Sequence, residues 1–237
     1  MMHMTFNGVR KTNIYLLEGR QKGPFAPLNR EITSIGRSHR LRRTDKGLLE
    51  IQQPIGYKAI TRDDALRIKD EIAAWLVTDS WAPLQFDDEL GRTYWSVVDG
   101  TLEDLARDSR SVLWRGTVKF LSAYTTGQEH EINVPTTYQS FTIRGQDQTP
   151  WTTYTRFTAP RSQYTLETNK GLYVLLNYNF IEGDILRIDY SKREVTLNNK
   201  DLAVSVSLST NWAMLQPGTV QVRASEPTTV TYTERYY

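Results

Sequence analysis

Apolar residues recur at helical spacing in one segment of the chain. Thr61 precedes this segment and Asp64 follows three residues later, a variant of the capping box that marks a helix start. Pro83 ends any continuation of the pattern. The sequence therefore predicts one amphipathic helix over residues 62–77 that packs on a sheet. Its buried face is formed by residues spaced three and four apart, namely Ala65, Ile68, Ile72 and Leu76.

Elsewhere the chain alternates apolar and polar residues at every second position, which is typical of half-buried strands. Residues 185–190 and 194–198 alternate in this way on either side of a short polar segment, so they are expected to pair as a hairpin. Residues 229–237 alternate again, and a strand at a chain end is usually tied into a sheet. In the first half the same pattern predicts strands over residues 48–53, 84–86, 93–98 and 111–120.

The composition changes near residue 123 and indicates two domains. Threonine and tyrosine, which favour strands, concentrate in the second half: 19 of 28 threonines and 10 of 13 tyrosines follow this residue. The polar segment Thr125–Gln128, within a boundary region at residues 119–131, is expected to be a connector. We therefore expect a mainly β protein with an α+β first domain, a β-sheet or β-sandwich that carries the single helix.

Composition also excludes several kinds of chemistry. The 237 residues include no cysteine, so disulfides, thiol nucleophiles and thiolate metal sites are excluded. The longest apolar run, residues 72–77, has six residues, and no signal segment opens the chain, which predicts a soluble protein without a membrane partner. The net charge of +2 gives no general reason to expect a nucleic-acid partner. Apolar residues make up only 39%, alongside six tryptophans, of which Trp151 is the one expected to be exposed.

One dense acidic cluster stands out, formed by Asp87, Asp88 and Glu89, with Arg92 three residues later. One interpretation is a paired-carboxylate acid–base site or a site for a hard cation. The favoured interpretation is a solvated turn held by an arginine–carboxylate contact, because adjacent carboxylates on a short turn lack the opposed geometry of a hydrolase site.

A basic run covers residues 37–46 and contains Arg40, Arg42 and Arg43. Gly36 and Gly47 flank it, which predicts a mobile, charged loop. Such a run can follow a phosphate backbone, but it has no interleaved aromatic residues for stacking on bases. The three histidines lack the spacing of metal ligands, and no phosphate-binding or nucleophile motif occurs. No catalytic, cofactor or metal residues are therefore assigned, and the chain is not expected to be an enzyme.

Several of these segments, in order along the chain, resemble the distal tail (Dit) proteins of siphoviruses. The most specific is the acidic turn, Leu84–Glu89, which leads to Arg92–Trp95. In the turn, Leu90–Gly91 stands where a proline is common in that family, a mild departure. The resemblance covers roughly residues 4–122 and 180–237. The other segments that carry it are Met4–Arg10 with Ile14–Gly19, Pro54–Lys58 with the helix, Gly183–Asn198, Trp212–Gly218 and Pro227–Tyr237.

The resemblance implies a structural virion protein. It implies an N-terminal ring-forming domain over residues 1–123, completed by a C-terminal strand at 228–237, and a galectin-like β-sandwich over residues 130–226. Six copies are expected to form a ring that joins the tail tube to the tail tip, with the tail tube protein, the tape measure protein and the tail-associated lysin or hub protein as partners, and in some relatives a receptor-binding protein. The expected location is the virion tail tip, after assembly in the host cytoplasm. The resemblance makes Asp87, Asp88 and Arg92 parts of a structural motif.

Three alternatives stay open at this point. The arginines at 40, 42 and 43 either contact a neighbouring subunit, the hypothesis we favour, or face a lumen through which DNA passes. The second domain is alternatively a carbohydrate-binding module for host wall glycans, although the His-x-Asn-x-Arg strand of sugar-binding galectins is absent and His130–Asn133 has the wrong spacing. The third alternative is a wall hydrolase that uses residues 87–89.

Overall fold

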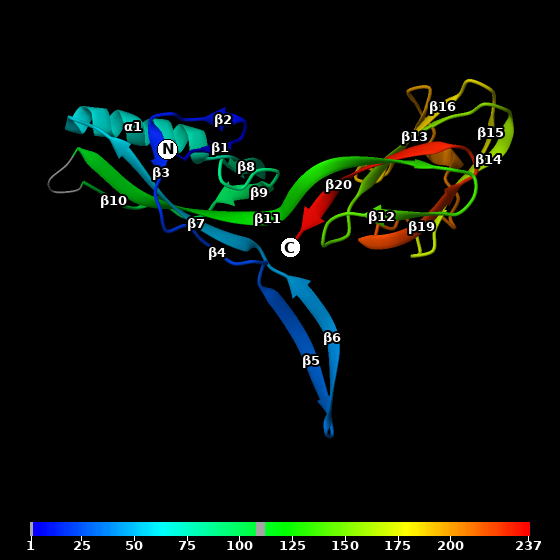
Figure 1. Ribbon diagram of the computed structural model, residues 1–237, viewed down its shortest axis with the longest axis horizontal. Coiled ribbons are helices and arrows are strands. Elements are labelled where there is room, and N and C mark those ends of the chain that lie inside the picture. The colour runs from blue at the N-terminus through cyan, green and yellow to red at the C-terminus, as the bar shows by residue number, and fades with distance from the viewer. Residues whose placement is uncertain (1, 108–111) are drawn as a thin grey trace. The chain divides into compact units, whose positions relative to one another are not determined.

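The structure is a computed structural model that describes residues 2–107 and 112–237. It divides into two compact units: unit 1 extends to Thr126 and includes Tyr237, and unit 2 runs from Gly127 to Tyr236. Each unit has its own cluster of buried apolar side chains. Strands dominate both units (Figure 1), so the expected mainly β fold class is confirmed.

Unit 1 is an antiparallel sheet with one helix on it. Strands β9, β8, β1 and β2 follow β11 in that order, while β7 pairs along the start of β11 and carries β3 and β4. Strands β5 and β6 form a separate two-stranded sheet. The bounds are β1 Met4–Phe6, β2 Val9–Arg10, β3 Ile14–Leu16, β4 Gln21–Lys22, β5 Leu28–Ile35, β6 Ser38–Lys46, β7 Leu49–Lys58, α1 Arg62–Leu76, β8 Ala82–Phe86, β9 Thr93–Val98, β10 Glu103–Arg107 and β11 Leu113–Val134.

The predicted helix is confirmed as α1. The capping box is complete, because the Thr61 hydroxyl accepts from the Asp64 N–H at 3.0 Å and the Asp64 carboxylate accepts from the Thr61 N–H at 3.4 Å. Trp75 anchors the last turn by donating from its indole N–H to the carbonyl oxygens of Phe6 and Val9, at 3.2 and 3.1 Å. The predicted apolar face is buried and joins the core of unit 1: Ala65, Ile68, Ile72 and Leu76.

Unit 2 is a sandwich of two antiparallel sheets. One has the strand order β18-β17-β16-β13-β20-β11 and the other the order β12-β19-β14-β15. The predicted hairpin is confirmed, with Leu186 opposite Leu197 and Ile188 opposite Val195. The bounds are β12 Gln139–Ile143, β13 Trp151–Arg156, β14 Arg161–Thr168, β15 Tyr173–Phe180, β16 Ile185–Asp189, β17 Glu194–Leu197, β18 Lys200–Asp201, the 3-10 turn η1 Ala203–Ser205, β19 Gly218–Ala224 and β20 Thr228–Tyr236.

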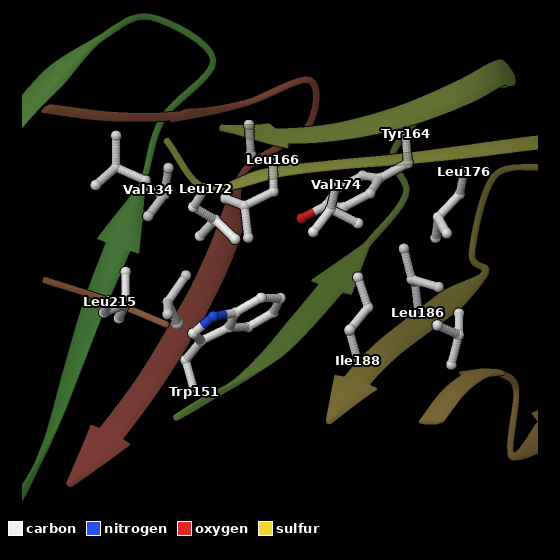
Figure 2. Packing of buried hydrophobic residues seen from close by; sticks show 14 of the residues in the cluster. Val134, Trp151, Tyr164, Leu166, Leu172, Val174, Leu176, Leu186, Ile188 and Leu215 are labelled. Atoms are coloured by element: carbon white, nitrogen blue, oxygen red, sulfur yellow. The ribbon is translucent and has the colours of Figure 1, made fainter. Parts of the chain in front are cut away.

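The core of unit 2 lies between these two sheets, and it contains Trp151. The expectation that Trp151 is exposed is wrong, since only 1% of it is accessible. It opens β13 on the inward-facing side, and its indole N–H donates to the Ala213 carbonyl oxygen at 2.9 Å. Figure 2 shows Trp151 and Ile188 on one side of the core and Leu166 and Val174 on the other.

Strand β11 replaces the expected connector between the domains. It is continuous from Leu113 to Val134, and the residues predicted to form a polar linker lie within it. A Cβ at Gly127 would lie 2.7 Å from the Tyr236 ring and would clash with the Glu234 carboxylate, so a larger residue there would force these two side chains to shift. Because β11 pairs with β7 and β9 in its first part and with β20 further on, one strand serves the sheets of both units.

Two further strands differ in position from the sequence predictions. Residues 228–237 were predicted to complete the N-terminal domain, but β20 lies between β13 and β11 in unit 2, and Tyr237 alone belongs to unit 1. The strand predicted over residues 111–120 is observed from Leu113 onward, while Ser111 lies outside the described residues. Among the described residues, no helix has the length and apolar character needed to cross a membrane.

Candidate functional site: the acidic turn and the basic hairpin

The acidic cluster forms the turn between β8 and β9. The Glu89 N–H donates to the Phe86 carbonyl oxygen at 3.1 Å, and the Arg92 N–H donates to the Glu89 carbonyl oxygen at 3.2 Å. Gly91 has a φ of +78°, a conformation that favours glycine in a tight turn. The sequence therefore folds locally as the favoured interpretation predicted, with three consecutive acidic residues displayed on one short turn.

The carboxylates are bound by basic residues from far upstream in the chain. Arg10 donates to both oxygens of Asp87, at 2.9 and 2.8 Å, in a bidentate pair. Arg20 bridges the other two acidic residues, at 2.9 Å from Asp88 and 2.7 Å from Glu89. The expected arginine–carboxylate contact is present, but these partners come from the N-terminal segment, and Arg92 contributes a backbone hydrogen bond to the turn.

Two further side chains, Lys22 and Tyr94, contact Glu89 and stabilise its ionised carboxylate. Lys22 donates to the Glu89 carboxylate and to the Tyr94 hydroxyl, each at 2.5 Å, and the Tyr94 hydroxyl donates to the same carboxylate. Burial raises the pKa of Glu89, but the hydrogen bonds from Lys22 and Tyr94 and the charge of Lys22 outweigh burial, so the pKa lies below its ordinary value. Burial and the contact with Glu89 raise the pKa of the Tyr94 hydroxyl.

The basic side chains of this cluster also pack on aromatic rings. The Arg20 guanidinium lies 3.7 Å from the centre of the Phe86 ring, and its Nε donates to the Gln53 side chain at 2.6 Å. The Lys22 ammonium lies 4.6 Å from the centre of the Tyr94 ring. The cluster therefore fastens the segment that contains β4 to the β8–β9 turn and to β7. A general acid in a hydrolase needs a raised pKa, whereas the pKa of both Asp88 and Glu89 is lowered.

The basic run is a strand rather than the predicted loop. Arg40, Arg42 and Arg43 lie on β6, which pairs with β5 from Leu28 opposite Lys46 to Ile35 opposite Ser38. The register shifts between Glu31 and Ile32, which leaves Arg42 at a bulge. The flanking glycines mark the hairpin turn and the exit of the strand rather than a flexible loop. These arginines therefore lie on a different sheet from the acidic turn.

The hairpin is almost wholly exposed to solvent. Every residue of β6 is exposed, and one residue of β5 is partly buried. Its apolar side chains are exposed as well: 58% of Ile32, 66% of Ile35 and 53% of Leu41 are accessible. Ile32 and Leu41 lie directly opposite each other, so they form one apolar pair on the hairpin. Figure 1 shows β5 and β6 as a long two-stranded ribbon.

Sequence reasoning missed an apolar hollow at the base of this hairpin. The hollow has a volume of about 380 Å³, and Phe25, Leu28 and Tyr237 contribute to its lining. The Lys46 ammonium lies 4.2 Å from the centre of the Tyr237 ring and closes one side. The run Gly23-Pro24-Phe25-Ala26-Pro27 was the available signal, because it places an exposed aromatic residue between two prolines just before β5. In residues 2–107 and 112–237, no three side chains of the metal-ligating types are grouped to hold a metal ion.

Known proteins match this chain in sequence and in fold. Residues 144–236 match the siphovirus-type tail component, C-terminal domain. The distal tail protein of Bacillus phage SPP1 is 26% identical over 183 residues, which are 74% of this chain and 71% of that protein.

Solved structures show the same fold. The crystal structure of the SPP1 Dit protein, described as a paradigm of the hub adsorption apparatus in phages that infect Gram-positive hosts, has a TM-score of 0.88 at 18% identity and covers 100% of both chains. A chain of the phage P2 baseplate in its activated conformation with Ca has a TM-score of 0.53 at 5% identity and covers 99% of this chain and 98% of that one.

Sequence and fold together support a structural role in a phage tail. Within this class, the predicted resemblance to siphovirus distal tail proteins is confirmed, in sequence over most of the chain and in fold over all of it. The acidic turn, which carried the most specific part of the resemblance, is in this structure a cluster of ion pairs that fastens the N-terminal segment.

Proposed function

We propose that six copies of this chain form a ring at the tip of the tail, assembled in the host cytoplasm, that joins the tail tube to the baseplate and host-adsorption apparatus. The partners would be further copies of this chain, the tail tube protein, the tape measure protein and the tail-associated lysin or hub protein, with a receptor-binding protein as a further candidate. The likeness to distal tail and baseplate proteins supports this proposal. The exposed β5–β6 hairpin is the observation that carries it.

A hairpin of two strands is marginally stable in water unless something packs on it. The apolar pair Ile32 and Leu41, together with Ile35, is exposed on this hairpin, and β5 and β6 hydrogen-bond only to each other in the described sheets. Burying these side chains would contribute about 1.5–3 kcal/mol each. A neighbouring copy that covers the hairpin would supply this stabilisation.

The hollow at the base of the hairpin gives such a contact a receiving surface. A ring needs two different, complementary surfaces on every subunit, because its contacts are heterologous. The hairpin offers an apolar projection, and the hollow near Phe25 and Tyr237 offers an apolar recess. We assign the hairpin of one copy to the recess region of the next, so that both surfaces belong to one repeated interface.

Arg40, Arg42 and Arg43 would strengthen this interface through their charge. Arg43 already pairs with Asp45 at 2.7 Å on the same strand, while 70% of its side chain stays accessible. Charges at the edge of an interface chiefly set association rate and partner choice. The three arginines are therefore assigned to a subunit contact rather than to DNA, and their effect should weaken as salt concentration rises.

The test is the mass of the purified full-length chain by light scattering and its shape by negative-stain imaging. The wild-type chain is expected to form hexameric rings. Both the triple variant R40Q/R42Q/R43Q and the single variant Ile32→Asp should shift the mass toward the monomer. The matched control is R156Q/R193Q/K200Q, which removes three exposed charges from unit 2 and should leave the mass unchanged. A wild-type chain that stays monomeric at all concentrations, or hairpin variants with unchanged mass, would contradict the proposal.

A further inference from the structure

The outer face of one sheet of unit 2 is hollowed. This sheet contains β17, β16, β13 and β20, and alternate residues of each strand face away from the core. On β13 these residues are Thr152 and Tyr154, which are exposed, whereas Trp151 and Thr153 are buried. The hollow on this face has a volume of about 560 Å³, within the range of about 300–1,000 Å³ that is usual for small-molecule sites.

Strand register arranges the lining side chains in two rows. In one row Thr152 lies opposite Thr231 on β20 and opposite Asp189 on β16, and Asp189 in turn lies opposite Glu194. In the other row Tyr154 lies opposite Arg187. Because these residues sit on hydrogen-bonded strands rather than on loops, the sheet fixes their spacing before any ligand binds, which lowers the entropic cost of binding.

The hollow combines one aromatic ring with many hydrogen-bonding groups. Tyr154 is 39% accessible, and the Arg187 guanidinium lies 5.5 Å from the centre of its ring. An aromatic face carries negative charge density and attracts weakly positive C–H groups, which a sugar ring presents on its apolar side. The threonine hydroxyls beside it can donate hydrogen bonds to ligand hydroxyl groups or accept them, and the carboxylates can accept them.

Charges in the hollow cancel. The Lys192 ammonium lies 3.7 Å from Asp189 and 3.9 Å from Glu194, and Arg187 adds a second positive charge to the lining. Two cations and two carboxylates leave no net charge that would favour a polyanion or a polycation. The lining therefore favours a neutral ligand with many hydroxyl groups.

The hollow also extends beyond one ring-sized site. A second recess of about 160 Å³ shares Thr152 and Thr231 with the first and continues toward Pro150 and Thr233. A protein partner would need roughly 800 Å² per side with an apolar or aromatic centre. Tyr154 is the aromatic side chain of the main hollow, and polar groups dominate the rest of its lining. A chain of linked small polar rings fits this groove better than a protein surface does.

We propose that the outer face of this sheet is a binding groove for a neutral oligosaccharide. Tyr154 would support the apolar side of one sugar ring, and Asp189 and Glu194 would accept hydrogen bonds from its hydroxyl groups. The groove lies wholly within unit 2, so the proposal goes beyond the ring and does not depend on it.

The test probes a microarray of neutral and anionic oligosaccharides with the labelled full-length chain and then titrates the strongest neutral ligand calorimetrically. Tyr154→Ala should weaken binding at least tenfold, and Asp189→Asn should weaken it measurably. Asp189→Asn keeps the shape of the side chain and an acceptor for the Lys192 N–H, so it preserves the turn. The matched control is Tyr178→Ala, which removes an exposed tyrosine from β15 of the opposite sheet.

Retained binding by Tyr178→Ala with loss in the two groove variants would support the proposal, provided that all variants melt as the wild type does. Three results would overturn it: no neutral oligosaccharide bound above background, binding confined to anionic glycans, or groove variants that bind as tightly as the wild type. A negative result here leaves ring formation unaffected, because that is measured by mass.

Discussion

Glu89 shows how a partly buried carboxylate keeps its charge. Burial disfavours the ionised form, but Lys22, Arg20 and the Tyr94 hydroxyl all donate to this one group. The side chain is 22% accessible, so solvent screens part of these interactions and their net contribution stays modest. The result is a cluster whose strength depends on the carboxylate remaining ionised.

Replacing Glu89 by glutamine should therefore destabilise unit 1. The variant leaves Arg20 and Lys22 beside a neutral amide, and we expect a loss of about 1–2 kcal/mol in the free energy of unfolding at neutral pH. Chemical denaturation monitored by tryptophan fluorescence measures it. Glu182→Gln, at an exposed position in unit 2, is the control and should be neutral within about 0.5 kcal/mol. Equal stability of the two variants would contradict the assigned role.

The stability difference between the wild type and Glu89→Gln is also expected to depend on pH. Because the pKa of Glu89 is lower in the folded chain than its ordinary value of 4.5, its contribution is complete above that value. The contribution is lost as the pH falls below 4.5 and through the folded pKa. The stability difference between wild type and Glu89→Gln should therefore shrink as the pH is lowered through this range, and a difference that grew instead would contradict the assignment.

At the scale of elements, the N-terminal cap of α1 can be tested on its own. The Thr61 side chain satisfies a backbone N–H that would otherwise lack a partner at the helix start. Thr61→Ala should lower the free energy of unfolding by about 1 kcal/mol. Thr12→Ala, an exposed threonine in the same unit, serves as the control in the same denaturation experiment. A cost for Thr12→Ala equal to that for Thr61→Ala would show that the cap contributes nothing specific.

Elements with local signals were predictable from the sequence, and those defined by distant partners were not. Helix α1 carries its cap and its apolar face within a short segment. The sequence predicts a loop at β6 because its exposed, charged residues show no buried alternation, and only its pairing with β5 makes it a strand. Pro150 predicts a loop and hence an exposed Trp151, whereas Trp151 is the first residue of β13 and faces the core.

The candidate site was predictable only in part for the same reason. The sequence located the acidic turn and the basic run, since each is a contiguous run of charge. It could not pair Asp87 with Arg10, which is 77 residues away, or Glu89 with Lys22, which is 67 residues away. The groove around Tyr154 likewise draws on strands that meet only after folding.

For the whole molecule, two separate cores predict that a defect in one unit is felt mainly there. Leu186→Ala removes a fully buried side chain from the core of unit 2 and should cost about 2–5 kcal/mol. Hydrogen exchange should accelerate in β13, β16 and β20, while β1 and β8 of unit 1 keep most of their protection. Leu208→Ala, at a fully exposed position, should change neither region. Uniform acceleration over both units would indicate a single cooperative structure.

Strand β11 limits how the chain length can vary at the boundary between the two units. A loop absorbs an added residue at little cost, but the boundary at Thr126 and Gly127 lies inside a paired strand. One inserted residue there would turn each following side chain of β11 to the opposite face, so that buried Val134 would point outward. Length changes at this boundary are therefore restricted to steps of two residues or to a bulge, and variation between related chains should accumulate in the turns instead.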